Sequence, residues 1–534
     1  MQEKTAAQSK RRRISLSKVA LLLITTALLG QILGFMRTKL VNANFSALGP
    51  NSTDAYFAAF NIPDFFFYTV AAGALGVAFM PVLVDRLHKG DKKGVWEISS
   101  SLLNMLAIIM TLVGVLIFIF AGQLVHYVVA PNMTAEQLSN AVFIMRLVSL
   151  NPLFFTISGI LSAVQQSLGR FFFYAIAPLF YNLSIIVSIY VFKHTGLGLK
   201  GLGFGALVGG ILQMFVVALG LIGTNFRWHP SIMWHSKDFR GVLRNLPPRS
   251  LDQGMDQVQS IVETRFARRL GTGNVSYYNN ANIMSQVPVL LIGTAISTAA
   301  FPRLAARLSQ GRPDLFNRDF LRVFRVLLWL GLPIGIISYF ARGYLARLIF
   351  TRDAPQIALI FGFLVTAAFA GILYSILSRW FYAQKDTKTP LFVSFFTVGI
   401  NIVLAALLAR PSSYGIAGLA LSQSIASSLE VVILFTIMLI RDHRLLNAEF
   451  WGACIRIVSV SGFSLLAGYI AVTFFPLGIN DRGFITLGVK LAFIAAVTFS
   501  VHILMSGLFD LEETRPIFKA FKNLVLRPLK GFPY

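Results

Sequence analysis

The chain has 534 residues, of which 56% are hydrophobic and 13% charged, and it carries a formal net charge of +25. This balance excludes an ordinary soluble domain and predicts a polytopic all-α membrane protein. The single cysteine, Cys454, excludes an internal disulfide and a cysteine-based metal site.

Apolar segments long enough to cross a hydrocarbon core of roughly 30 Å recur along the whole chain. We predict fourteen spans, near residues 19–44, 53–84, 96–128, 139–165, 172–192, 202–223, 250–270, 276–305, 322–350, 356–383, 390–409, 414–440, 451–475 and 484–508. The first follows a basic stretch, is span-length and lacks a small-residue cleavage site, so we predict an anchor in place of a cleaved signal peptide.

Basic residues gather in alternate connections between the spans. They occur near 4–13, 86–93, 227–249, 307–318, 385–388 and 441–444, and in the tail at 515–530. The positive-inside rule therefore predicts that both termini are cytoplasmic. A nucleic-acid-binding protein needs its basic residues on one face of a soluble domain, so we predict no nucleic-acid partner.

The second span, 53–84, combines an apolar composition with polar residues. Asp54 opens it, and Asn61 and Pro63 follow within three turns. An aspartate inside a span is costly and usually faces a cavity or a partner. Pro63 and Gly73 predict a break or bend in this helix. A kinked helix with Asp54 at the headgroups is the alternative.

The seventh span, 250–270, carries a polar stripe. Asp252, Asp256, Gln259 and Glu263 stand at i, i+4, i+7 and i+11, which is one face of a helix. Several charges on one span are expected to face the protein interior, and such groups mark ion pathways in transporters. The alternative for the first two is a place in water at the cytoplasmic mouth.

The chain also repeats itself. Tyr56, Asn61 and Pro81 recur 221 residues later as Tyr277, Asn282 and Pro302, and Gln165 and Asn182 recur 219 residues later as Gln384 and Asn401. We predict two parallel six-helix lobes, as in transporters whose halves are related by an axis along the membrane normal. The lobes are 1–223 and 250–445, joined by a cytoplasmic linker at 224–249 and followed by spans thirteen and fourteen and a cytoplasmic tail at 446–534.

Motifs of nucleotide hydrolysis and of hydrolytic catalysis are missing from the sequence. It contains no GxxxxGK[ST], HExxH or GxSxG. We therefore predict a transporter without a catalytic residue, a metal or a cofactor, other than a coupling proton or sodium ion. The membrane potential supplies about 2.3 kcal/mol per charge per 100 mV.

Four segments carry a resemblance to a known family. They are TDAYFAAFNIP with GALGVAFMP within 53–81, LLGQILGFMRTKL at 28–40, GRFFFYAIAPLFYNLSII at 169–186 and FYAQKDTKTP at 381–390. They resemble the lipid II flippases (MurJ, also called MviN) of the multidrug/oligosaccharidyl-lipid/polysaccharide exporter superfamily. The resemblance implies fourteen spans in two lobes plus two helices, with a central cavity for a lipid-linked pyrophosphate.

The resemblance also implies which residues line the cavity. Of the family's cavity charges, Arg37 and Asp54 remain, whereas Gln31, Phe67 and Ile283 stand where the family pattern has arginines. We assign substrate binding to Arg37, Asp54, Gln31, Asn61, Asn282 and Arg265, and gating or ion coupling to Glu263, Asp256 and Asp252. Our hypothesis is that Asp54 and Glu263 pair with Arg37 and Arg265 in a cluster that closes the outward face.

We therefore predict a flippase that moves an undecaprenyl-pyrophosphate-linked precursor, lipid II above all, across the cytoplasmic membrane by alternating access for peptidoglycan synthesis. The predicted partners are this lipid-linked oligosaccharide, the phospholipid bilayer and cell-wall synthesis enzymes. Three alternatives stay open: a flippase for another polyprenyl-linked oligosaccharide, a cation-coupled multidrug antiporter, and a non-transporting scaffold. Intramembrane charge argues against the scaffold.

Overall fold

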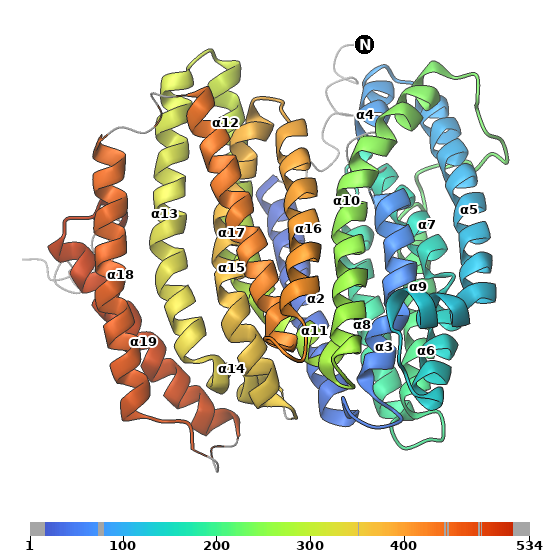
Figure 1. Ribbon diagram of the computed structural model, residues 1–534. Coiled ribbons are helices and arrows are strands. Elements are labelled where there is room, and N and C mark those ends of the chain that lie inside the picture. Colours follow the sequence, from blue (N-terminus) through green and yellow to red (C-terminus); the bar gives the residue numbers. More distant parts are fainter. Residues whose placement is uncertain are drawn as a thin grey trace, which may run out of the picture. The chain divides into compact units, whose positions relative to one another are not determined.

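The computed structural model describes residues 16–72, 79–350, 352–442, 445, 448–478, 481 and 483–515 (Figure 1). Every regular element in these ranges is a helix, which confirms the all-α fold class. Eleven helices of the described part are long and apolar enough to cross a membrane. The count of fourteen spans stays a prediction. The basic N-terminus before residue 16 and the tail after residue 515 lie outside the described residues.

Contacts between Cα atoms divide the chain into two units, 1–273 and 274–534. The first unit contains α2 (Leu16–Asn44), α3 (Thr53–Phe66), the π-helical η2 (Phe67–Ala72), α4 (Met80–His88), α5 (Lys92–Gln123), the π-helical η4 (Leu124–Val129), α6 (Ala135–Val148), α7 (Asn151–Ser167), α8 (Phe172–Phe192), η5 (Gly198–Lys200), α9 (Gly201–Leu219) and α10 (Lys237–Arg269). Although we predicted that the second lobe begins at residue 250, α10 packs against α3, η2 and η4 of this first unit.

Polar side chains define where several of these helices begin. Ser52, Asp91, Thr134 and Ser236 each accept a hydrogen bond from a backbone N–H of the first turn of α3, α5, α6 and α10, respectively. Such N-caps satisfy N–H groups that have no partner within the helix. Thr134 forms a complete capping box with Gln137, which fixes the Gln137 side chain at the start of α6.

The second unit contains a comparable set of helices. They are α11 (Asn274–Pro288), the π-helical η6 (Val289–Thr294), α12 (Ala295–Ser309), α13 (Pro313–Phe340), α14 (Arg342–Ile349), α15 (Ala354–Ala383), α16 (Lys388–Leu408), α17 (Ile416–Arg441), α18 (Ala448–Phe474), α19 (Phe484–Leu508) and η7 (Glu512–Thr514). The neighbours repeat between units: α8 packs on α9 as α16 does on α17, and α7 packs on α9 as α15 does on α17.

A π-helical segment interrupts the corresponding helix of each unit. η2 follows α3 and η6 follows α11, and they begin 222 residues apart, close to the 221-residue separation of the sequence repeat. A proline lies inside each preceding helix, Pro63 in α3 and Pro288 in α11. The break predicted at Pro63 thus takes the form of a switch from α- to π-helix, whereas Gly73 lies outside the described residues.

The last two long helices, α18 and α19, dock on α13 through buried polar groups. His502 Nε2 donates to the Trp329 carbonyl oxygen at 3.0 Å, and His502 Nδ1 lies 2.8 Å from Ser464 Oγ. Trp329 Nε1 donates to Ser506 Oγ at 2.8 Å. These four side chains are buried. Because an unsatisfied polar group is costly in an apolar surrounding, this network fixes how the helix pair packs on α13.

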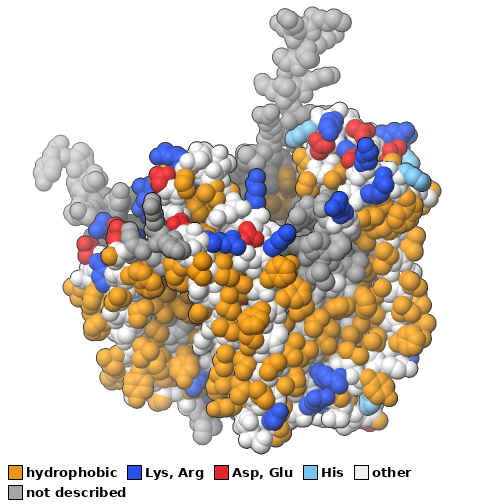
Figure 2. Space-filling view, turned by 45° about the horizontal axis from the view of Figure 1, so that its top comes forward, with side chains coloured by type: hydrophobic (Ala, Val, Ile, Leu, Met, Phe, Trp, Pro, Cys, Tyr) orange, Lys and Arg blue, Asp and Glu red, His pale blue; other side chains and the backbone are white. Residues whose placement is uncertain are grey.

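The outer surface matches a membrane environment. In Figure 2, hydrophobic side chains cover the middle of the visible face, and Lys and Arg side chains gather toward its upper and lower edges. Large apolar side chains are exposed on many helices, for example Ile108 on α5 and Phe484 on α19. Apolar surface of this extent marks contact with lipid.

Candidate functional site

An ion pair between α3 and the end of α10 is the most deeply buried charge contact in the described part of the first unit. Arg268 Nη1 lies 3.3 Å from Asp54 Oδ2, with 3% and 0% of the two side chains exposed. The Gly273 backbone N–H donates to the same oxygen at 2.6 Å. A buried pair offsets its desolvation cost only when further hydrogen bonds satisfy both groups, and Asp54 receives such a bond.

Arg268 also forms hydrogen bonds to the segment before α6 and to the start of α6. Its Nη2 donates to Gln137 Oε1 at 2.7 Å and to the Asn132 carbonyl oxygen at 2.9 Å. Gln137 belongs to the capping box of α6 and also donates through Nε2 to the Gly49 carbonyl oxygen at 2.8 Å. One arginine therefore joins α10 to the start of α3 and to the start of α6.

A second polar contact joins the same two helices two turns further along α3. Asn61 Oδ1 accepts hydrogen bonds from Ser260 Oγ at 3.3 Å and from Thr264 Oγ1 at 3.4 Å. Asn61 is seven residues beyond Asp54, which is about 10 Å along a helix, and Ser260 and Thr264 precede Arg268 by eight and four residues. The two contacts thus share one antiparallel register of α3 on α10 (Figure 1).

The acidic stripe of α10 is only partly buried. Glu263 is buried and accepts a hydrogen bond from Gln259 Nε2 at 2.8 Å. Asp256, two turns earlier, is exposed and takes part in a polar interaction. Asp252 lies in α10, but its side chain is outside the described residues. Of these carboxylates, Glu263 near the end of α10 and Asp54 at the start of α3 are therefore the two that are shielded from solvent.

The structure corrects the predicted partners of these carboxylates. Arg268, which we left out of the predicted site, pairs with Asp54, in place of Arg37 or Arg265. Arg265 instead donates to the carbonyl oxygens of Tyr127 and Val128, the latter at 2.9 Å, at the end of η4. Residues two apart on a helix point in different directions, which is why Glu263 and Arg265 turn toward different neighbours.

The predicted site residues of the first span lie on α2, in the same unit. Arg37 is half-buried, and its guanidinium carbon lies 6.0 Å from the ring centre of Tyr181 on α8. Gln31, nearly two turns earlier, is exposed. Phe67 opens η2 and packs edge-on against Phe155, with ring centres 5.4 Å apart. An aromatic contact thus occupies one of the positions where the family resemblance expects a cation.

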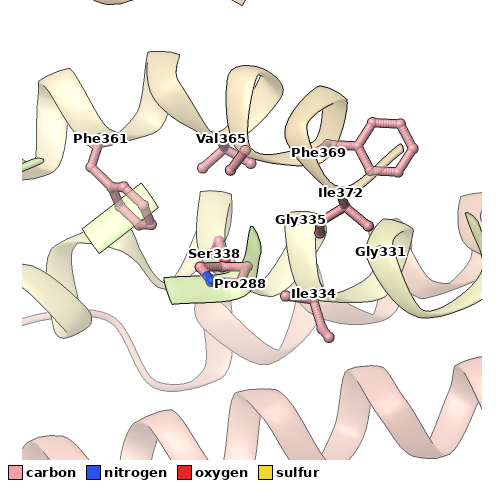
Figure 3. Close-up of a pocket in the computed structure, with 10 residues that line it drawn as sticks. Pro288, Gly331, Ile334, Gly335, Ser338, Phe361, Val365, Phe369 and Ile372 are labelled. Atoms are coloured by element: carbon pink, nitrogen blue, oxygen red, sulfur yellow. The ribbon is translucent and has the colours of Figure 1, made fainter. Parts of the chain in front are cut away.

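In the second unit, Asn282 and Ile283 lie half-buried on α11. Asn282 accepts a hydrogen bond from Ser285 Oγ through its carbonyl oxygen at 2.8 Å. A hollow nearby is lined by Gly331 and Ser338 of α13 and by Phe369 of α15 (Figure 3). Its lining contains no charged side chain, so it has nothing with which to hold a pyrophosphate.

The FYAQKDTKTP segment connects α15 to α16 and is bonded to the end of α17. Arg441 Nη1 lies 2.6 Å from Asp386 Oδ2, and Thr389 Oγ1 donates to the same oxygen at 2.6 Å. Burial opposes ionisation of Asp386, but the hydrogen bonds from Thr389 and Arg441 outweigh it and lower the pKa of this carboxyl to about 2. The segment therefore acts by fixing three helix ends in the second unit.

Together, the helical fold with repeated neighbours and the eleven helices of the described part that are long and apolar enough to cross a membrane define a polytopic membrane protein, in which a buried ion pair joins α3 to α10. Residues 46–479 match the family model of the lipid II flippase MurJ. The chain therefore belongs to the lipid II flippase family.

Curated relatives agree with this assignment. A lipid II flippase of Burkholderia cenocepacia is 28% identical over 439 residues, which cover 76% of this chain and 81% of the relative. A probable lipid II flippase of Rhizobium tropici is 26% identical over 507 residues, covering 89% and 92%.

Solved structures share the fold. A lipid II flippase in an inward closed conformation matches with a TM-score of 0.75 at 20% identity, covering 92% of this chain and 98% of that one. An inward-facing multidrug resistance transporter of the MATE family and MOP superfamily matches with a TM-score of 0.68 at 15% identity, covering 80% and 98%. The predicted helical transporter fold is thus confirmed.

Proposed function

We propose that this protein moves lipid II from the inner to the outer leaflet of the cytoplasmic membrane and so supplies peptidoglycan synthesis. The observation that carries the proposal is the family match across residues 46–479. The buried ion pair of the first unit supports it, since burying two charges is costly and calls for a role in the protein.

The Asp54–Arg268 pair and the Asn61 contact act in this proposal as a latch between α3 and α10. Arg268 touches three acceptors from α3 and from the start of α6, so rotation of α10 breaks all of these bonds together. A substrate pyrophosphate competes with Asp54 for the guanidinium, because Arg binds phosphate and carboxylate through the same planar donor set. Release of the latch opens the face of the unit on which it lies.

Four finer features belong to the same proposal. A proton or a sodium ion couples to transport at the acidic groups of α10, Asp256 and Glu263. Both termini lie in the cytoplasm, as the distribution of basic loops indicates. Cell-wall synthesis enzymes are partners that consume the flipped precursor. The predicted cavity between two six-helix lobes stays part of the proposal.

A second candidate, another polyprenyl-pyrophosphate-linked oligosaccharide as cargo, is favoured by one observation. Gln31, Phe67 and Ile283 stand at positions where the family resemblance expects arginines. A cargo whose headgroup is bound through different contacts to its sugar would not need arginines at these three positions.

Replacement of a lipid II flippase in a depleted bacterial host tests the proposal. We expect this chain to restore growth, and Arg37→Ala to abolish the rescue at equal protein level. A chain that reaches the membrane in normal amount but does not restore growth would overturn lipid II as the cargo.

A further inference from the structure

A hollow of about 610 Å³ lies in the first unit between the start of α5 and the segment that follows α9. Lys93 and Trp96 of α5 and Phe226, Arg227 and His229 of the following segment line it, together with Asn225. Its volume is in the range of ordinary ligand pockets. No role in transport falls on these residues.

The segment is fastened to α5, so the hollow is preformed. Asn104 Nδ2 donates to the carbonyl oxygen of His229 at 2.7 Å, and Trp228 Nε1 donates to Asn104 Oδ1 at 2.8 Å. The His229 backbone N–H donates to Ser100 Oγ at 3.1 Å. The loop between α9 and α10 runs beside α5 in Figure 1. Sites held by fixed neighbours bind with little ordering cost.

The lining is cationic and aromatic. Lys93 and Arg227 are both exposed, and the lining contains no carboxylate. Glu97 Oε1 lies 3.7 Å from Lys93 Nζ, which is a loose contact with a partner outside the lining. Trp96 and Phe226 stack edge-on, with ring centres 5.3 Å apart. This chemistry suits a phosphate group with an apolar body beside it.

His229 adds a second observation. Its Nδ1 is buried and has no hydrogen-bond partner among the residues that the structure describes. An orphaned polar atom beside a hollow indicates that a water molecule or a ligand completes its hydrogen bonds.

The position of the hollow along α5 indicates that its ligand is a lipid. Ile108 and Leu112 are 62% and 60% exposed on α5, as is expected of apolar side chains that contact acyl chains. Asn104, which holds the exposed Trp228, lies one turn or about 6 Å before Ile108, at the level where tryptophans mark the membrane interface. Trp96 and Lys93, which line the hollow from α5, lie two to three turns or about 12–17 Å further, on the polar side of that interface. The positive-inside rule assigns this end of α5 to the cytoplasm.

We propose that this hollow binds the phosphate headgroup of an anionic phospholipid from the cytoplasmic leaflet, with its acyl chains along the exposed face of α5. Lys93 and Arg227 hold the phosphate, and Trp96 and Phe226 form the wall. Basic pockets between helices on the cytoplasmic side recognise anionic headgroups in this way. The site is separate from the Asp54–Arg268 latch and does not depend on the cargo of transport.

Thermal unfolding of the purified full chain in a neutral detergent tests the site, since a ligand that binds the folded state raises the midpoint. The probes are dioctanoyl-phosphatidylglycerol, dioctanoyl-phosphatidylcholine and inorganic phosphate. We expect only phosphatidylglycerol to stabilise the protein. The double variant Lys93→Gln/Arg227→Gln should weaken its apparent affinity by about 30-fold, at roughly fivefold per surface cation.

The matched control is Lys92→Gln/Arg240→Gln, which removes two exposed charges from α5 and α10 outside the hollow. It should bind phosphatidylglycerol like the unaltered protein. Equal weakening in both double variants would reduce the effect to general surface charge and overturn the site. Stabilisation by inorganic phosphate as strong as by the lipid would overturn the lipid assignment. If the double variant does not fold, Arg227→Gln alone should show about a fivefold loss, and an unchanged affinity would refute the proposal.

Discussion

The latch formed by Asp54 and Arg268 makes a quantitative prediction. Removal of one member of a buried ion pair leaves the other uncompensated and costs about 3–5 kcal/mol. Arg268→Gln leaves the Asp54 carboxylate buried, with the Gly273 N–H as a remaining donor, so we expect a loss in the upper part of this range. Asp54→Asn leaves Arg268 with Gln137 and Asn132 as neutral acceptors, so we expect a loss near 3 kcal/mol.

A double-mutant cycle measures the pair itself. We expect the double variant Asp54→Asn/Arg268→Gln to lose about 1–3 kcal/mol less than the sum of the single variants, as contacting residues do. The assay is the free energy of unfolding in detergent, followed by transport in cells at matched protein level. The control cycle combines Asp54→Asn with Arg265→Gln. Arg265 donates to carbonyl oxygens of η4, so this cycle should be additive. Additivity in the Asp54–Arg268 cycle, or equal coupling in both cycles, would refute the latch.

Four further predictions follow from other parts of the chain. Arg37→Ala should abolish transport without loss of protein from the membrane, whereas Arg37→Lys should keep part of it, because lysine supplies charge without the planar donor set; full activity of Arg37→Ala would remove this residue from the site. His502→Leu should lower the unfolding midpoint, since it leaves the Trp329 carbonyl oxygen unsatisfied at about 1–3 kcal/mol, and an unchanged midpoint would contradict the docking role. Because the folded pKa of Asp386 is lowered to about 2, its stabilisation is present above its usual pKa near 4 and is lost as the pH falls through 2; Asp386→Asn should flatten this part of the stability curve. In a Cys454→Ala background, a cysteine at residue 92 should resist an impermeant thiol reagent in intact cells and one at residue 132 should react, and the reverse pattern would invert the topology.

The sequence predicted the helical fold and the importance of Asp54 because both rest on strong local signals. A long apolar segment predicts a span, and a carboxylate inside one needs a partner. The partner itself was missed because three arginines end α10 and each residue turns the helix by about 100°. Ser260, Thr264 and Arg268 recur at spacing four on one face, and this spacing, matched to Asp54 and Asn61, was the available signal.

Other features had no signal in the sequence. Hydropathy does not distinguish an α-helical from a π-helical segment, so η2 and η6 appear only in the structure. The packing of α10 with the first unit was also hidden, because repeats place this helix at the start of the second half. Contacts of Ser260 and Thr264 with Asn61 decide that packing, and such long-range partners are fixed by the register of two helices.

The measurement that tests the central claim most directly follows lipid II across a bilayer. The purified chain is reconstituted into vesicles with fluorescent lipid II, and a membrane-impermeant reductant bleaches the label in the outer leaflet. We predict that vesicles containing this protein lose nearly all fluorescence, whereas protein-free vesicles and vesicles with Arg37→Ala lose about half. Loss of only half with well-folded protein, under an imposed membrane potential and a sodium or proton gradient, would contradict the assignment as a lipid II flippase.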